Sequence, residues 1–117
     1  MKIVFVDYLQ IMHVANISKN AIREQVVAAI CRGLKEIAKE LKITVVAGAQ
    51  LNRSVDGRGG NKRPQLQDLR ESGSIEQDSD IVLMLYSPAY YGMEFDDGKD
   101  IKNLAEVIVA KNRHGRT

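Results

Sequence analysis

Apolar stretches along the chain predict the strands of one sheet. The runs at residues 3–6, 43–49 and 81–86 contain almost no polar alternation, and residues 103–113 form a further strand-like stretch. A strand that is apolar on both faces is typical of the interior of a parallel sheet covered by helices. We therefore expect the first three stretches to be buried strands.

A long amphipathic helix is expected between the first two strands. Ser18 follows Ile17 in the pattern of an N-cap behind a hydrophobic entry residue, and the helix should end near Leu41. Apolar residues recur at spacings of three and four, which predicts one stripe that packs on a sheet: Ile22, Val26, Ile30, Leu34, Ile37 and Leu41. A strand, a helix and a strand in this order form a right-handed βαβ unit. The fold class is therefore α/β, with a mostly parallel sheet and flanking helices over residues 1–117.

The composition indicates the cellular compartment of the protein more clearly than its chemistry. The 117 residues suffice for one domain, and a net charge of +2 does not by itself indicate a nucleic-acid partner. The single cysteine, Cys31, excludes an internal disulfide and is expected to be a small buried apolar residue. No apolar stretch reaches the roughly 18 residues of a membrane span, and the N-terminus lacks a signal-peptide pattern. We expect a cytoplasmic protein with no membrane partner.

Polar residues end the first two strands and are the first candidates for chemistry. Asp7 follows the run at residues 3–6, and Gln50 follows the run at residues 43–49. Ligands of open α/β sheets bind beyond the carboxyl ends of the strands, where a carboxylate can hold Mg²⁺ and a glutamine can contact a phosphate oxygen or orient a water. Each residue also has an ordinary interpretation, Asp7 as a cap and Gln50 as the first polar residue of a loop.

Residues 52–65 form a glycine-rich basic segment, which we call the basic loop. Asp56 is the one acidic residue in this loop, set against four cations: Arg53, Arg58, Lys62 and Arg63. The glycines indicate mobility, and the cations are either solvated or available to the phosphate backbone of a nucleic acid. No aromatic residue interleaves with the charges in the sequence, so base stacking has no support.

Residues 68–80 contain two capping patterns, which predict two short helical turns joined near Gly73. A DNA contact in this acidic segment would depend on Arg70, on backbone amides near Gly73 and on Glu71 orienting a donor. Further along, Asp97-Gly98 predicts a hairpin turn.

At the end of the last predicted strand, Lys111 and Arg113 should share one face. They are either solvated or directed at the phosphate of a neighbouring molecule.

The combination of these motifs in this order resembles the bacterial replicative hexameric DNA helicases, the DnaB-like family. The resemblance runs from about Lys2 to Gly115 and rests on DYLQ at 7–10, AQLNR at 49–53, DLRESGSIEQDSD at 68–80 and KNR at 111–113. Ala49 departs from a frequent serine, and Arg116 departs from a common proline.

The resemblance implies a RecA-like motor of the P-loop NTPase type that uses ATP and Mg²⁺ to move 5′ to 3′ along single-stranded DNA. Asp7 is similar to the Walker B carboxylate that holds Mg²⁺ through water, and Gln50 is similar to the γ-phosphate sensor. Arg113, with Lys111 beside it, resembles the finger that reaches the nucleotide of the next subunit. The family's channel loop, which touches the DNA backbone, corresponds to Arg70, Glu71 and Gly73. Further implied partners are a homo-hexameric ring, primase and a helicase loader.

The Walker A pattern is absent from these 117 residues. Its Gly-Lys pair could only be Gly98-Lys99, but Asp100 follows this pair and Met93 occupies the first glycine position. We therefore expect the N-terminal half of the motor domain to be missing and the chain alone to hydrolyse no ATP. Two alternatives remain: a non-catalytic DNA-binding or ring-interaction module, and another RecA-like ATPase.

Overall fold

The computed structural model describes residues 1–117, except for the side chains of residues 70–72. The chain divides into two compact units. Unit 1 comprises Met1–Asn52 and Leu69–Ser79, and unit 2 comprises Arg53–Asp68 and Asp80–Thr117. Within the described residues, no helix is both long and apolar enough to cross a membrane.

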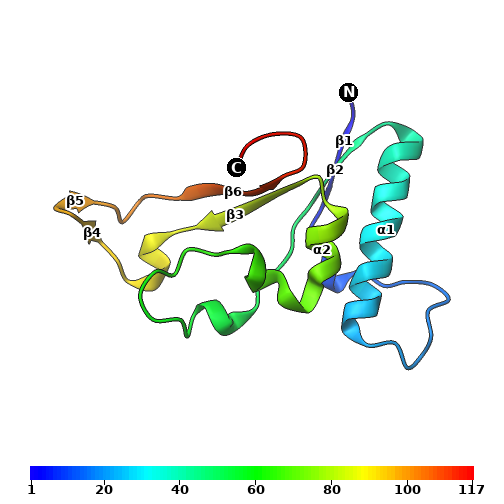
Figure 1. The fold of residues 1–117 in the computed structure, drawn as a ribbon, viewed down its shortest axis with the longest axis horizontal. Helices are drawn as coiled ribbons and strands as arrows, with labels where there is room; N and C mark the ends of the chain where they lie inside the picture. The colour runs from blue at the N-terminus through cyan, green and yellow to red at the C-terminus, as the bar shows by residue number, and fades with distance from the viewer. The chain divides into compact units, whose positions relative to one another are not determined.

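The elements follow the predicted order, with short 3-10 turns between them. The helices and strands are β1 (Ile3–Val6), α1 (Arg23–Leu41), β2 (Thr44–Ala47), α2 (Gly73–Asp78), β3 (Ile81–Tyr86), β4 (Phe95–Asp96), β5 (Lys99–Asp100) and β6 (Glu106–Asn112) (Figure 1). The 3-10 turns are Leu9–Ile11, Arg53–Val55, Leu66–Ser72 and Pro88–Tyr91.

Unit 1 contains the predicted βαβ arrangement. β1 and β2 pair in parallel, from Ile3 opposite Thr44 to Val6 opposite Ala47, and α1 connects them. The expectation of full burial is wrong for both strands, because Phe5 in β1 is 75% exposed and Val46 in β2 is 45% exposed. β1 and β2 form a two-stranded ladder among the described residues, so each strand has one neighbour in its sheet.

The helix α1 starts later than the sequence predicts. The carbonyl of Ser18 accepts the N–H of Ala21 at 3.0 Å, so Ser18 closes a turn ahead of the helix. The helix begins at Arg23, where the side chain of Gln25 accepts the N–H of Ile22 at 3.2 Å. Its end at Leu41 is confirmed, and Lys42 adopts a left-handed φ of 51° that terminates the helix.

The buried face of α1 is also displaced from the predicted stripe. Val27, Ile30 and Cys31 are buried, and α1 packs against α2. Ile22 and Ile37 are exposed, so only part of the stripe lies in the core. The spacing predicts one apolar side of the helix, whereas the buried residues are confined to a narrower face around Val27 and Ile30. Burial raises the pKa of the Cys31 thiol, as expected for a buried apolar cysteine, and nearby Asp78 adds to the effect.

Unit 2 is built on an antiparallel pair, which corrects the expectation of a mostly parallel sheet. β3 pairs with β6, from Ile81 opposite Asn112 to Tyr86 opposite Glu106. The register shifts after Val82, which lies opposite Lys111. The connection between these strands turns back through the β4–β5 hairpin, so β6 returns against β3 rather than crossing over.

The hairpin itself is where the sequence predicts it. Asp97 and Gly98 have φ values of 48° and 77°, which suits the turn that Asp-Gly favours between antiparallel strands. β3 alternates in burial, with Val82 and Met84 buried and Leu83 exposed, so it is a half-buried strand rather than a fully buried one.

The displaced face of α1 generates a stability prediction. Replacing Ile30, which is 6% exposed, with Ala should destabilise the chain by about 2–5 kcal/mol, because it leaves a cavity. Ile37→Ala removes the same atoms from a residue that is 45% exposed, and should change stability by less than about 0.5 kcal/mol. Urea unfolding of both variants measures the difference, and equal losses would contradict the assigned face.

Candidate functional site

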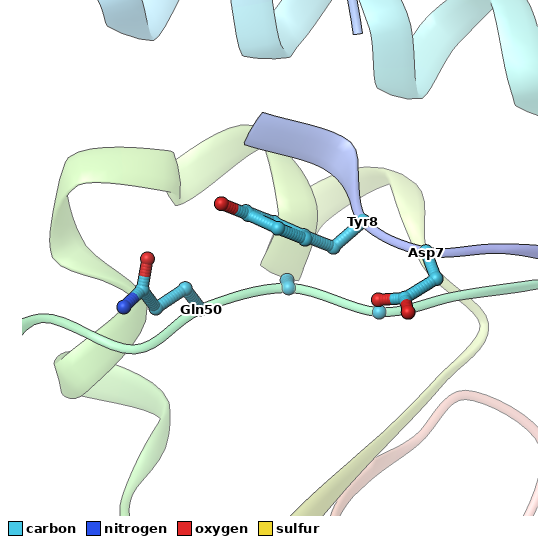
Figure 2. Close-up of a pocket in the computed structure, with 5 residues that line it drawn as sticks. Asp7, Tyr8 and Gln50 are labelled. Carbon is cyan, nitrogen blue, oxygen red and sulfur yellow. The ribbon is translucent and has the colours of Figure 1, made fainter. Parts of the chain in front are cut away.

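The carboxyl ends of β1 and β2 meet at an open pocket in unit 1. Val6 and Ala47 are paired, so Asp7 and Gly48 leave the ladder side by side. The pocket has a volume of about 340 Å³ and is lined by Asp7, Tyr8, Gly48, Ala49 and Gln50 (Figure 2). The expectation that Asp7 and Gln50 share one edge of the sheet is therefore confirmed.

Backbone hydrogen bonds continue past the strands and fix this edge. The N–H of Gly48 donates to the carbonyl of Val6 at 2.8 Å, and the N–H of Leu9 donates to the carbonyl of Gly48 at 2.9 Å. Leu9 is buried. The Asp7–Tyr8 peptide bond is cis. A methyl group on Gly48 would lie 3.6 Å from Oδ1 of Asp7, so the carboxylate lies directly over this glycine.

Gln10 is a site residue that the sequence did not single out for any role. Its Oε1 accepts the N–H of Gln50 at 3.2 Å, and its Nε2 donates to the carbonyl of Gln50 at 3.0 Å. Nη2 of Arg23 donates to the carbonyl of Gln10 at 2.6 Å. The sequence signal for Gln10 is its place three positions after Asp7, near the end of a strand. Nothing in the sequence pairs Gln10 with Gln50, which lies 40 positions away.

The oxygen atoms in the pocket suit a hard cation that also binds the phosphates of a ligand. Asp7 is the only carboxylate among its lining residues, and the tyrosine ring of Tyr8 extends toward Gln50 (Figure 2). Mg²⁺ is commonly held by one or two carboxylates together with water and substrate phosphates, so a single carboxylate beside an amide fits Mg²⁺. Among the described residues, no group of His, Cys, Asp and Glu forms a metal site by itself.

In unit 2, the basic loop makes more internal contacts than its sequence indicates. Arg58 forms an ion pair with Asp68, which is 4% exposed. Arg63 donates two hydrogen bonds to Glu106, at 2.8 and 2.6 Å, and these lower the pKa of the Glu106 carboxyl. The expectation that Asp56 is the only acid facing these cations is wrong, because the two partners lie outside the loop in sequence.

Tyrosines also approach these cations, although none lies within the basic loop in sequence. Arg63 lies 5.0 Å from the ring centre of Tyr86, and Lys62 lies 5.1 Å from the ring centre of Tyr91. Lys62 also donates to the carbonyl of Asp56 at 2.9 Å. The sequence predicts a solvated or mobile loop, whereas in the structure cations of this loop contact partners in unit 2. Arg53 is exposed and has no polar side-chain partner in the part of the chain described.

The last predicted cation pair lies at the end of β6. This strand ends at Asn112, one residue before Arg113, and the shared face of Lys111 and Arg113 stays a prediction. Nη1 of Arg113 lies 3.1 Å from Oδ1 of Asp80, and the N–H of Arg113 donates to the carbonyl of Asp80 at 2.8 Å. The side chains of Arg113 and Asp80 are 41% and 50% exposed, and ion pairs this accessible to solvent contribute little to stability.

The predicted DNA-contact segment has the expected backbone form. The 3-10 turn Leu66–Ser72 is followed directly by α2, so the two helical turns meet at Gly73 as predicted. The side chains of Arg70 and Glu71 lie outside the described residues. The two predicted caps are wrong, because Asp68 lies inside the 3-10 turn and Ser74 lies inside α2. The carboxylate of Asp68 instead accepts the N–H of Gln65 at 2.7 Å and pairs with Arg58.

Comparison with known proteins gives a consistent result. The family described as DnaB-like helicase C terminal domain matches residues 1–117. The replicative DNA helicase DnaC of Bacillus subtilis (strain 168) is 47% identical over 112 residues, which are 96% of this chain and 23% of that protein. The replicative DNA helicase DnaB of Geobacillus stearothermophilus is 46% identical, with the same coverage. The chain thus spans less than a quarter of the length of these relatives.

Solved structures agree with this match. The structure of a DnaB-like replicative helicase and its interactions with primase superposes with a TM-score of 0.84 at 46% identity, covering 97% of this chain and 26% of that chain. A solved ATPase domain superposes with the same TM-score, and the match covers 38% of the chain of that structure. These matches favour the helicase over the other RecA-like ATPases that the sequence left open. The chain belongs to the DnaB-like helicase C-terminal domain family.

Proposed function

We propose that this chain supplies the metal-binding and phosphate-sensing side of the ATPase motor of a replicative DNA helicase acting in the cytoplasm. The observation that carries this proposal is the meeting of Asp7 and Gln50 at one pocket, at the carboxyl ends of paired parallel strands. Asp7 would hold Mg²⁺ through water, and Gln50 would contact the γ-phosphate of ATP. Bound Mg²⁺ neutralises charge that develops on the transferring phosphoryl group.

The cradle for the remaining phosphates would come from helicase sequence other than these 117 residues. Backbone amides of a P-loop and its lysine hold the phosphates in motors of this type. The Walker A pattern does not occur in this chain. The chain by itself is therefore expected to hydrolyse no ATP, whereas a complete helicase that contains it should be active.

The experiment that tests this function is Asp7→Asn in the complete helicase. Loss of the carboxylate charge should lower kcat for ATP hydrolysis on the order of 10²–10³-fold, the range seen when one transition-state contact is removed. Asp97→Asn in the exposed hairpin is the matched control, because asparagine also tolerates its positive φ. Steady-state release of phosphate measures both, and an active Asp7→Asn enzyme would contradict the proposal.

We also propose that residues 68–80 carry the single-stranded DNA contact, through Arg70, Glu71 and Gly73. The resemblance of this segment supports it, together with the turn that brings a 3-10 helix to the start of α2 at Gly73. Within the basic loop, Arg53 is exposed and is the residue proposed for an additional phosphate contact. Arg58, Lys62 and Arg63 would serve mainly to hold the loop, since each already has a partner in unit 2.

Arg70→Ala in the complete helicase should weaken binding to single-stranded DNA without sequence preference. Loss of one phosphate contact should reduce the slope of log K against log salt concentration by about 0.7. Fluorescence anisotropy at several salt concentrations measures this slope. Lys39→Ala, on the exposed surface of α1, is the control that should leave it unchanged. A slope that is unaltered in Arg70→Ala would remove this residue from the DNA contact.

A further part of the proposal places Arg113 in the active site of the next subunit of a homo-hexameric ring, with Lys111 beside it. The resemblance of KNR at 111–113 supports this assignment, and the side chain of Arg113 is 41% exposed. A cation supplied from a neighbouring chain is typically worth about 10³–10⁵ in rate. Primase and a helicase loader are the remaining proposed partners, primase being named with the similar solved helicase.

Mixed rings test the assignment of Arg113. Arg113→Ala should nearly abolish hydrolysis while nucleotide binding and ring assembly are retained. Mixing these subunits with subunits broken at Walker A should restore part of the activity, because some interfaces then combine a normal Walker A with a normal Arg113. Lys102→Ala, which removes another exposed cation paired with a carboxylate, is the control expected to stay active. Mixed rings that assemble but stay inactive would exclude action in trans.

A further inference from the structure

The side-chain amide of Gln10 acts as an additional rung beyond the end of β2. The last paired residue of β2 is Ala47, and Gln50 lies three positions further along the chain. At that point the N–H and the carbonyl of Gln50 are both bonded by one side chain, at 3.2 and 3.0 Å. An amide group offers one donor and one acceptor side by side, which is the pattern that a neighbouring strand presents.

Gln10 is itself anchored on both sides. The preceding residue, Leu9, is buried and bonded to the carbonyl of Gly48 at 2.9 Å. The carbonyl of Gln10 accepts Nη2 of Arg23, the first residue of α1, at 2.6 Å. The charged donor makes this a strong hydrogen bond. A chain of contacts therefore runs from the start of α1, through Gln10, to the backbone of Gln50.

We infer that Gln10 is a positioning residue that fixes the Gln50 backbone, and thereby the placement of the Gln50 side chain relative to Asp7. This inference rests on the proposed role of Gln50 as the phosphate sensor. The position of Asp7 is set by the ladder, because Asp7 directly follows the paired residue Val6. Gln50 lies beyond the last backbone hydrogen bond between the two segments, so its position depends on another contact. Gln10 thus acts through another residue and makes no contact with the substrate itself.

The inference predicts a graded loss in the complete helicase. Gln10→Ala removes both bonds to Gln50 and should lower kcat about tenfold with little change in KM for ATP, as expected for misplacement of a group that acts in the transition state. Gln10→Glu keeps an acceptor for the Gln50 N–H but loses the donor to the Gln50 carbonyl, so its kcat should fall between those of wild type and Gln10→Ala. Gln67→Ala, which loses only a bond to Gln65, is the matched control and should keep the wild-type kcat.

A double variant separates positioning from a general structural role. Single-turnover hydrolysis is measured for Gln10→Ala, Gln50→Ala and the two combined. If Gln10 acts through the Gln50 side chain, adding Gln10→Ala to Gln50→Ala has no further effect. A loss of the same size in both backgrounds would overturn the inference, as would a fully active Gln10→Ala beside an impaired Gln50→Ala. A fully active Gln50→Ala would instead overturn the proposed function of Gln50.

Amide hydrogen exchange in the 117-residue chain gives a readout that needs no ATPase activity. Exchange of the Gln50 N–H should be roughly three- to tenfold faster in Gln10→Ala, because its acceptor is gone. Exchange of the Thr44 N–H, which donates to the carbonyl of Lys2 at 3.0 Å at the start of β2, should be unchanged and shows that the ladder is intact. Unchanged exchange at Gln50 would overturn the inference independently of the kinetic result.

Discussion

The parallel pairing of β1 with β2 is the constraint on which the candidate site depends. Val6 opposite Ala47 brings Asp7 and Gly48 out of the ladder at the same level, although they lie 41 positions apart in the chain. A slip of this register would separate Asp7 from Gln50 and turn side chains to the other face. The crossover through α1 fixes the parallel direction, and the two bonds between Gly48 and the first strand's end extend the pairing to the pocket.

Charged residues in unit 2 illustrate a second constraint, which is that a buried carboxylate needs a partner. Asp68 is nearly inaccessible, and Arg58 provides its counter-charge. Removing one member of such a pair generally costs more than the pair contributes, because the other charge stays buried. The same loop carries Arg63 against Glu106 and Tyr86, so a segment rich in glycine and cations is ordered by ion pairs and tyrosine rings.

The sequence was sufficient for the order and type of the main elements, but less so for their packing. The βαβ unit, the end of α1 at Leu41 and the Asp97-Gly98 hairpin follow from local patterns of apolar residues, caps and turn residues. The start of α1, its buried face and the antiparallel return of β6 depend on which segments meet in space, and periodicity does not report that. In the site, the strand-end rule identified Asp7 and Gln50, whereas Gln10 and the partners of the basic loop act through contacts between positions distant in sequence.

The central claim is that Asp7 and Gln50 form one side of the ATP site of a helicase motor. The most direct measurement is a cryo-electron microscopy structure of the complete helicase on single-stranded DNA with Mg²⁺, ADP and aluminium fluoride. We predict that the Asp7 carboxylate contacts the water shell of Mg²⁺ and that the Gln50 amide lies within hydrogen-bond distance of the fluoride that mimics the γ-phosphate. A nucleotide bound elsewhere, with Asp7 and Gln50 both away from the metal and the phosphate mimic, would contradict the account.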